Sequence, residues 1–302
     1  MSHSAVSNSR STLLTRRGFL GGVMLAGAGA TIARAAAGSR WQIGCYTRPW
    51  AEHEYRVALD GIAEAGYAHA GLMTAKDGVI VGPDTPAEKV RQMATEANSR
   101  GLKIASIYGG NFLAKNSVPE GVAALKRLVD NVALCSCPAL LLGGTSRAET
   151  VDNYYRVVAD CADYARSKGV SFSVKPHGGT NATGPQCRQL IEKVGRAKLG
   201  LWYDPGNIFF YSEGKLDPVD DSETVDGLVV GMSVKDYRPP KDVALTLGTG
   251  QVNFAKVFGR LQRGGFRGGP LIVECLAPGS VAQITAEAKK ARRFLETLVT
   301  QA

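Results

Sequence analysis

SFSVKPHGGTNATGPQCRQLIEKVGRAKLGLWYDPGN, residues 171–207, reads as a strand, a helix and a second strand. Residues 171–175 and 200–203 are short runs typical of buried strands, and residues 184–193 carry apolar side chains at helical spacing. A helix between two such strands is long enough to connect them in parallel. This stretch therefore predicts a parallel sheet covered by helices.

The same alternation extends in both directions from this stretch. The predicted strands are residues 42–46, 69–73, 103–108, 139–142, 171–175, 200–203, 229–235 and 271–274. Helical patterns lie between most of them, and that of residues 218–227 is the weakest. Eight strands are the number that closes a (β/α)8 TIM barrel. An open doubly wound sheet is less favoured, because TRPW (residues 47–50) replaces the glycine-rich phosphate turn expected after its first strand.

Composition agrees with one large globular domain. The chain has 302 residues, of which 44% are hydrophobic and 21% charged, and barrels of about 250 residues are common as single domains. Four of the 36 basic residues lie within residues 1–35, which leaves 32 against 27 acidic residues. No block of five or more like charges appears in the remainder, so we do not expect nucleic-acid binding.

The amino terminus has the pattern of an export signal. TRRGFL (residues 15–20) precedes a mildly apolar, small-residue stretch at 21–32 and then ARA at 33–35. This order is typical of a twin-arginine signal peptide with a cleavage site near Ala35. We therefore expect a signal at residues 1–35, a mature barrel at 36–302, the twin-arginine translocation machinery as a partner, and a periplasmic location. The apolar stretch is too short and too rich in glycine and alanine for a stable membrane anchor.

Polar residues end several predicted strands, where barrels of this type place their chemistry. Asp204 and Glu274 follow apolar strands, and a buried carboxylate needs a charged partner or a metal. Lys175 ends one strand with His177 two residues later, and Lys235 ends another. Asp204, Glu274, Lys175 and Lys235 are the candidate catalytic residues. The alternative for Asp204 is a structural role in a turn or helix cap. The alternative for Lys235 is a position on the protein surface.

Other strand-end side chains are suited to a hydroxylated ligand. Aromatic rings stack on sugar faces, while amide, hydroxyl and imidazole groups bind sugar hydroxyls. For the aromatic residues, packing in the core is the alternative, and Trp202 and Tyr203 cannot both point inward. Arg48 also follows a strand, without an assigned role. The candidate substrate-binding residues are His177, Asn207, Tyr46, Tyr108, Trp202 and Ser233.

Four segments of the second half carry a family resemblance. They are LWYDPGN (201–207), SVKD (233–236), GTGQVNF (248–254) and IVE (272–274). Together they resemble motifs of the xylose isomerase-like barrel superfamily, and the resemblance covers roughly residues 41–299. Its sugar isomerases and epimerases typically bind one divalent ion through Glu, Asp, His and Glu. This chain keeps Asp204 and Glu274 but has Lys175 and Ser233 where the other two ligands are expected.

Two arrangements of the site follow from these replacements. In one, His177, Asp204 and Glu274 bind a divalent ion such as Mn, Zn or Mg, which polarises a carbonyl while a carboxylate moves the neighbouring proton. In the other, the Lys175 ammonium takes the place of the metal, pairs with both carboxylates and stabilises an enolate. The sequence leaves both open.

The resemblance implies a sugar isomerase or epimerase. The substrate is expected to be a sugar or keto-sugar, and the reaction is proton abstraction next to its carbonyl through an enediolate. One alternative is a lyase or hydratase acting on 3-keto-glycosides through the same enolate, and another is a catalytically silent sugar-binding barrel. A homodimer is expected only by analogy with relatives.

Overall fold

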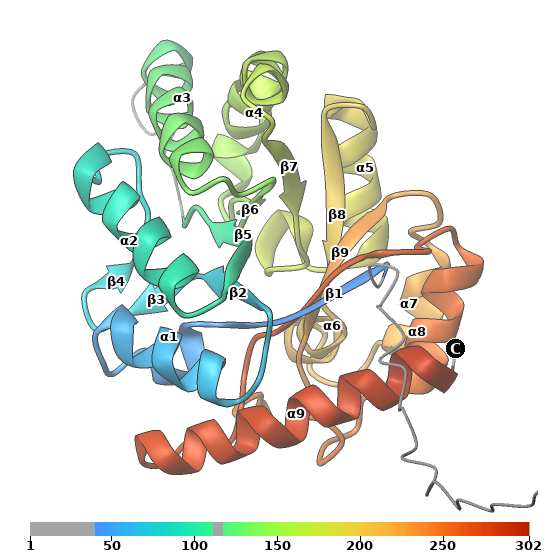
Figure 1. Cartoon of the computed structure of the whole chain (residues 1–302). Helices are drawn as coiled ribbons and strands as arrows, with labels where there is room; N and C mark the ends of the chain where they lie inside the picture. The colour runs from blue at the N-terminus through green and yellow to red at the C-terminus, as the bar shows by residue number, and fades with distance from the viewer. Residues whose placement is uncertain (1–39, 111–116, 302) are drawn as a thin grey trace, which may run out of the picture. The chain divides into compact units, whose positions relative to one another are not determined.

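A computed structural model describes residues 40–110 and 117–301, and the predicted signal peptide lies outside them. Eight parallel strands form a closed barrel in the order β1-β10-β9-β8-β7-β6-β5-β2, with helices around it (Figure 1). The predicted (β/α)8 barrel is therefore confirmed. The barrel strands are β1 (Trp41–Tyr46), β2 (His69–Leu72), β5 (Lys103–Tyr108), β6 (Ala139–Leu142), β7 (Ser171–Val174), β8 (Leu199–Tyr203), β9 (Val229–Val234) and β10 (Gly269–Val273).

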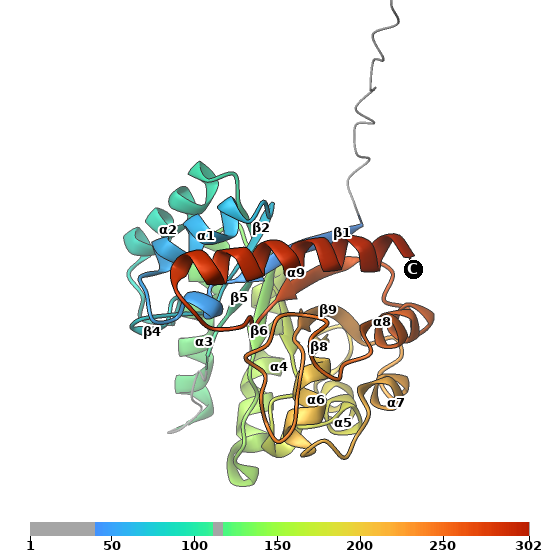
Figure 2. The same ribbon diagram turned by 90° about the horizontal axis from the view of Figure 1, so that it is seen from below.

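The helices agree with the apolar periodicity of the chain. The longer ones are α1 (Tyr55–Glu64), α2 (Ala87–Ser99), α3 (Val118–Leu134), α4 (Val151–Ser167), α5 (Gly184–Val194), α8 (Phe254–Arg263) and α9 (Val281–Gln301). Helix α9 lies beside α1 and crosses β1 (Figure 2). No helix in residues 40–110 and 117–301 combines the length and apolarity needed to cross a membrane.

Three short features were not predicted as such. The hairpin of β3 (Thr74–Ala75) and β4 (Gly78–Val79) follows β2, and its two-residue strands are too short to show periodicity. Helix α6 (Pro205–Tyr211) begins directly after Asp204, and the weakly predicted helix near residue 218 is only α7 (Pro218–Glu223). The α6 helix is important because it brings additional side chains to the end of the barrel.

The barrel interior is a small apolar cluster separate from the main core. Its buried members come from strands or their ends around the barrel and are Tyr46, Met73, Ala105, Leu141, Trp202 and Ile272. Space for the largest rings depends on glycine: a Cβ at Gly71 would overlap the Tyr46 ring, and one at Gly231 would overlap Trp202. Tyr203 points to the outer core instead, where its hydroxyl donates to the Pro218 carbonyl.

Candidate active site

Four predicted catalytic residues meet just beyond the carboxyl ends of adjacent strands. Lys175, Asp204, Lys235 and Glu274 directly follow β7, β8, β9 and β10. Strand pleating places all four on the inward side, because each lies two residues beyond an inward-facing position of its strand. Their side chains are at most 2% exposed. The surface-exposed alternative for Lys235 is therefore wrong.

Each ammonium group bridges both carboxylates. Lys175 Nζ lies 2.7 and 2.9 Å from the two oxygens of Glu274, and 3.3 Å from Asp204 Oδ2. Lys235 Nζ lies 2.8 Å from Glu274 Oε1 and 3.0 Å from Asp204 Oδ2. The second oxygen of Asp204 accepts the backbone N–H of Asn207 and caps α6. Asp204 thus caps a helix with one oxygen and forms ion pairs with the other, so both interpretations of this residue from the sequence apply.

Arg48 adds a third cation. Its Nη1 donates to Glu274 Oε1 at 2.7 Å, and its side chain is 40% exposed. Arg48 had no predicted role, because the TRPW sequence does not show that its side chain points toward Glu274. We call Arg48, Lys175, Lys235, Asp204 and Glu274 the ion cluster; with every member charged, its net charge is +1.

Mutual contact keeps members of the ion cluster charged. Burial alone would raise the pKa of Glu274, but the charges of Lys175, Lys235 and Arg48 hold that pKa well below its usual range. Burial alone would lower the pKa of Lys235, but Asp204 and Glu274 raise it above its usual value. A strongly held carboxylate is a poor base, and a strongly held ammonium is a poor proton donor. The cluster is therefore better suited to binding negative charge than to moving protons.

A small cavity of about 170 Å³ opens above the ion cluster. Its lining includes Tyr108, His177 and Asn207 among the predicted substrate-binding residues, and Phe210 and Tyr211 from α6. Phe210 and Tyr211 were missed because no helix was predicted directly after Asp204. The volume is below the range of about 300–1,000 Å³ that accepts drug-sized ligands, so the cavity is suited to a molecule of monosaccharide size or smaller.

His177 is a neutral imidazole in this cavity. Burial, and then the charge of Lys175, lower its pKa to about 3. Its ring lies between aromatic neighbours, with centroids 5.9 Å from Tyr211 and 6.4 Å from Tyr108. Among the described residues, none hydrogen-bonds to either ring nitrogen of His177. The ring nitrogens are thus available to hydrogen-bond a ligand.

Three predicted substrate-binding residues do not line the cavity. Tyr46 Oη pairs with Ser106 Oγ at 2.9 Å, and Trp202 Nε1 donates to Ser233 Oγ at 3.2 Å. Tyr46, Trp202 and Ser233 lie two residues before Arg48, Asp204 and Lys235, which places them one layer deeper in the barrel. They face inward as expected, but their role is packing and support of the barrel interior.

Backbone contacts hold the segment that carries Lys175 and His177. The side-chain amide of Asn181 donates to the carbonyls of Lys175 and Gly143 at 2.7 and 3.0 Å. The amide of Asn207 donates to the Pro176 carbonyl at 2.6 Å. Asn207 therefore borders the cavity while its amide nitrogen positions the segment after β7.

Asp236 explains the glycine-rich segment near residue 250. Its two carboxylate oxygens accept four backbone N–H groups, from Tyr237, Gly248, Gly250 and Val252, at 2.8 to 3.1 Å. A Cβ at Gly250 would overlap the carboxylate. The carboxylate thus faces the loop after β9 rather than the cavity, and it holds in place the loop that contributes Val243 to the cavity lining.

The residues do not fit the predicted divalent-ion site. Within residues 40–110 and 117–301, no three His, Cys, Asp or Glu side chains are grouped so that they could bind a metal. His177, Asp204 and Glu274 are not brought together as one ligand set, and ammonium groups contact the oxygens that a metal would need. The observed contacts correspond instead to the arrangement in which Lys175 pairs with both carboxylates, with Lys235 as a second bridging cation.

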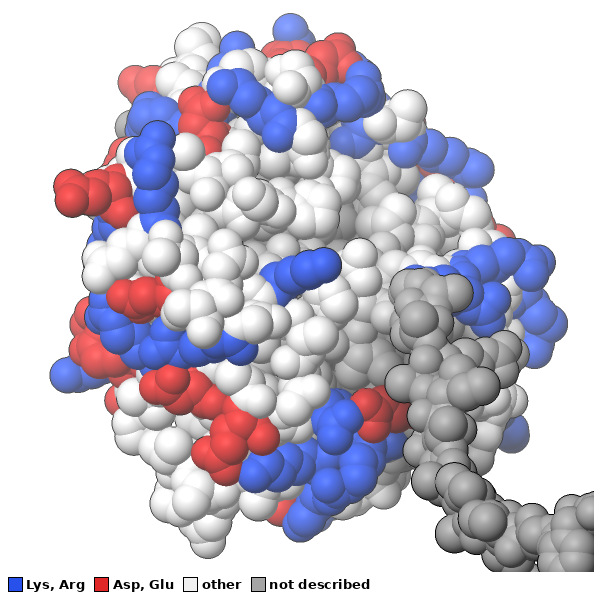
Figure 3. All heavy atoms as spheres, viewed as in Figure 1, with Lys and Arg blue, Asp and Glu red and all other residues white. Residues whose placement is uncertain are grey.

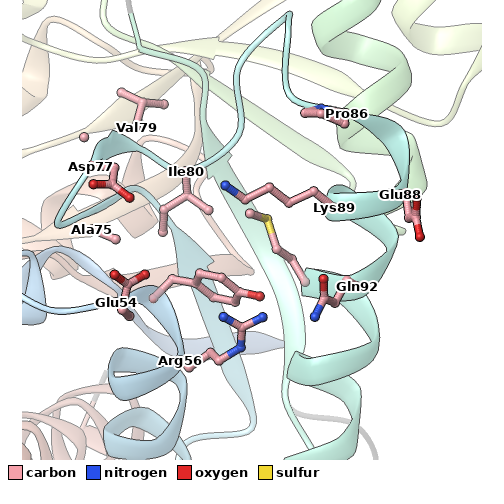
Figure 4. Close-up of a pocket in the computed structure, with 13 residues that line it drawn as sticks. Glu54, Arg56, Ala75, Asp77, Val79, Ile80, Pro86, Glu88, Lys89 and Gln92 are labelled. Carbon is pink, nitrogen blue, oxygen red and sulfur yellow. The ribbon is translucent and has the colours of Figure 1, made fainter.

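A second cavity lies outside the barrel end, between α1, α2 and the β3–β4 hairpin (Figure 4). It measures about 440 Å³ and is lined by charges of both signs. Tyr55 Oη and the Arg56 guanidinium are both bound to Glu96, at 2.7 and 2.8 to 3.0 Å. Because these polar groups are bound to each other rather than directed at one point, the larger cavity is a weaker candidate for a site.

Comparison with known proteins identifies the family. The model of the xylose isomerase-like TIM barrel family matches residues 59–298. The chain belongs to this family. A search of curated protein sequences returned no match.

Solved structures with this fold are distant in sequence. A xylose isomerase domain protein from Planctomyces limnophilus is 22% identical, with a TM-score of 0.67 over 86% of this chain and 98% of its own. A xylose isomerase-like TIM barrel protein from Mycobacterium smegmatis, solved in complex with magnesium, is 16% identical, with a TM-score of 0.71 over 87% and 99%. A D-psicose 3-epimerase solved in the presence of D-fructose is 14% identical, with a TM-score of 0.64 over 85% and 97%. At these identities the similarity establishes the fold.

Proposed function

We propose that this protein is a sugar isomerase or epimerase-like enzyme that moves a proton on the carbon next to the carbonyl of a sugar or keto-sugar. The observation that carries the proposal is the ion cluster, in which Lys175 and Lys235 bridge Asp204 and Glu274 beneath a cavity of monosaccharide size. Similarity in fold to a D-psicose 3-epimerase and an L-ribulose 3-epimerase supports the same class of reaction.

Fixed cations supply the stabilisation that the reaction needs. When the proton leaves the carbon, the C–H electron pair forms a carbon–carbon double bond and the carbonyl electrons move to oxygen. The resulting enolate oxygen is stabilised by the nearby cations Lys175, Lys235 and Arg48, which are already in place and need little reorganisation. Asp204 and Glu274 hold the two ammonium groups at the strand ends.

His177 is the best-placed proton carrier. It is neutral, lines the same cavity as the three cations and has ring nitrogens that no described residue hydrogen-bonds, whereas both oxygens of Glu274 are taken by the cations. Burial, and then the cations, lower the pKa of the imidazole, and the negative charge of the forming enolate raises that pKa as the imidazole accepts the proton. Return of the proton from the imidazolium to the neighbouring carbon isomerises the sugar. Epimerisation instead needs a second donor that delivers a proton to the opposite face of the carbon, after which the imidazolium loses its proton to solvent.

Hydrogen exchange tests the proposal directly. Free ketoses and aldoses are incubated with the enzyme in D2O, and loss of the C–H signal next to the carbonyl is followed by proton NMR. We expect exchange with at least one sugar and a 10²- to 10⁴-fold slower rate in His177→Gln, the range for loss of a general base. Tyr46→Phe, which lies outside the cavity, is the matched control and keeps the wild-type rate.

The same assay separates the alternatives. A lyase acting on 3-keto-glycosides would release the aglycone from such a substrate, because the enolate expels the group on the next carbon. Sugar binding with no exchange in any substrate would leave the catalytically silent barrel as the explanation. Equal exchange rates in wild type and His177→Gln would remove His177 from the mechanism.

We also propose export by the twin-arginine route, with residues 1–35 as the signal and residues 36–302 as the mature domain. The support is the TRRGFL sequence and the ARA site at residues 33–35. Replacing both Arg16 and Arg17 by Lys should retain the precursor in the cytoplasm, as measured by cell fractionation, whereas normal export would contradict the assignment. Light scattering on the processed protein would test the homodimer.

We further propose that the protein does not bind nucleic acid. On the face in Figure 3, basic and acidic side chains of the described residues are interspersed along the periphery, and no continuous basic stripe crosses it. Proteins that follow a phosphate backbone need such a stripe.

A further inference from the structure

The cavity has an excess of positive charge that the ion cluster does not neutralise. Three cations, Arg48, Lys175 and Lys235, face two carboxylates, Asp204 and Glu274. The other groups nearby do not compensate. His177 is neutral, burial raises the pKa of the Cys275 thiol, and the Asp236 carboxylate is directed at backbone N–H groups of its own loop.

Among the three cations, most of the unused hydrogen-bond donors lie on Arg48. Lys175 and Lys235 each direct their ammonium group at two carboxylates. Arg48 uses only Nη1 for Glu274, although a guanidinium has five N–H donors. Its Nε and Nη2 have no partner among the described residues, and the side chain is 40% exposed at the cavity.

We infer that the substrate is a sugar acid of monosaccharide size, whose carboxylate binds the free donors of Arg48; this inference rests on the proposed function. A carboxylate matches the planar guanidinium by accepting two parallel N–H groups, which a neutral hydroxyl cannot do. Its single negative charge also balances the net charge of +1. Met73, Phe210 and Val243 in the cavity lining limit screening by water and strengthen this pairing.

A carboxylate at this position would also assist the proposed proton transfer. His177 is kept neutral by burial and by Lys175, with Lys235 and Arg48 contributing in the same direction. An anion bound to Arg48 reduces the positive potential in the cavity. The imidazole then accepts a proton more readily in the substrate complex than in the free enzyme.

The test compares sugars that share a carbon skeleton and differ in the group at C6. Isothermal titration calorimetry at low ionic strength measures binding of D-glucuronate, D-glucose and D-glucose 6-phosphate, and then of D-fructuronate and D-fructose. We expect a uronate to bind about tenfold or more tightly than its neutral partner and than the sugar phosphate. Equal or tighter binding of the neutral sugars, tighter binding of the phosphate, or no binding of either uronate would overturn the inference.

Two variants locate the preference at Arg48. Arg48→Gln should remove the preference for the uronate, and Arg48→Lys, which keeps the charge but not the paired donors, should restore only part of it. Arg91→Gln changes the protein charge equally on an exposed face of α2 and should have no effect. An unchanged preference in Arg48→Gln would contradict the assignment.

Proton exchange distinguishes failure of this inference from failure of the proposed function. If uronates bind through Arg48 but show no exchange in D2O, the proposed reaction is wrong and the carboxylate site stands. If neutral ketoses exchange while uronates do not bind, the reaction stands and the carboxylate site is wrong.

Discussion

Replacing Glu274 by Gln removes one negative charge from the centre of the ion cluster while nearly preserving the shape of the side chain. Glu274 contacts Lys175, Lys235 and Arg48 and is 1% exposed. Removing one partner of a buried ion pair typically costs about 3–5 kcal/mol, because the remaining charge stays buried without compensation. Here the variant leaves Lys175 and Lys235 with Asp204 as their carboxylate partner and removes the carboxylate that pairs with Arg48, so we expect a loss within that range.

The size of this effect is measurable by thermal unfolding. For a domain of about 150–250 residues, each kcal/mol shifts Tm by about 2–4 °C, so Glu274→Gln should lower Tm by about 6–20 °C. Glu64→Gln is the matched control: Glu64 pairs with Lys289 at 2.9 Å and is 67% exposed. Such surface pairs contribute about 0–1 kcal/mol. An unchanged or raised Tm in Glu274→Gln would refute the reasoning, since it would mean that desolvation of Glu274 outweighs its attraction to the cations.

The pH dependence of stability gives an independent measure of the same interaction. The pKa of Glu274 is well below its usual range in the folded protein, while in the unfolded chain it is about 4.3. The unfolded state therefore binds more protons as the pH falls, and the contribution of Glu274 is present above about pH 4.3 and is lost below it. Wild type should lose more unfolding free energy than Glu274→Gln between pH 5 and pH 3. Parallel curves would contradict the lowered pKa.

Four further predictions test other parts of the site. Lys175→Glu places a third carboxylate beside Asp204 and Glu274 and should tighten Mn²⁺ binding at least tenfold by calorimetry; unchanged affinity would mean that the new side chain turns away. The imidazole of His177 should stay neutral from pH 8 to pH 5 in nitrogen NMR, consistent with a pKa of about 3. A titration midpoint near pH 6.5 would contradict the lowering of this pKa by burial and by Lys175. Asp236→Ala should lower the free energy of unfolding in urea by about 2–4 kcal/mol, because four backbone N–H groups lose their acceptor. An unchanged free energy of unfolding would mean that water accepts these hydrogen bonds equally well. Tyr46→Phe should lower the free energy of unfolding by about 1–3 kcal/mol, because the buried Ser106 hydroxyl loses its partner. Sugar affinity should not change, and an altered affinity would show that Tyr46 contacts the ligand.

Local sequence patterns were sufficient for the strands and for the direction of their side chains. The alternation along residues 171–175 and 200–203 places Lys175 and Asp204 on the inward side, because successive side chains of a strand point to opposite faces. The same rule applied to 229–235 and 271–274 adds Lys235 and Glu274. All eight strands and the set of four charged strand-end residues were therefore predictable.

Depth along the barrel axis was not predictable from that rule. Trp202 and Asp204 share a face, yet Trp202 fills the interior and Asp204 joins the ion cluster, because the stagger between neighbouring strands sets which level of each strand lies at the cavity. Tyr46 and Ser233 were predicted to bind the substrate because they face inward, but they also lie below the cavity. Their level depends on the register of neighbouring strands, which no single strand contains.

By itself, the sequence determined the closed barrel and the residues that line its carboxyl end, since both follow from local periodicity repeated eight times. Only the tertiary structure decided that Lys175 and Lys235 bridge Asp204 and Glu274 and that Arg48 joins them, while His177 remains neutral beside them. Charges that are 29 to 226 residues apart on separate segments become neighbours when the barrel closes. Their protonation then depends on burial and on mutual distances of about 3 Å, and neither is a property of any local segment.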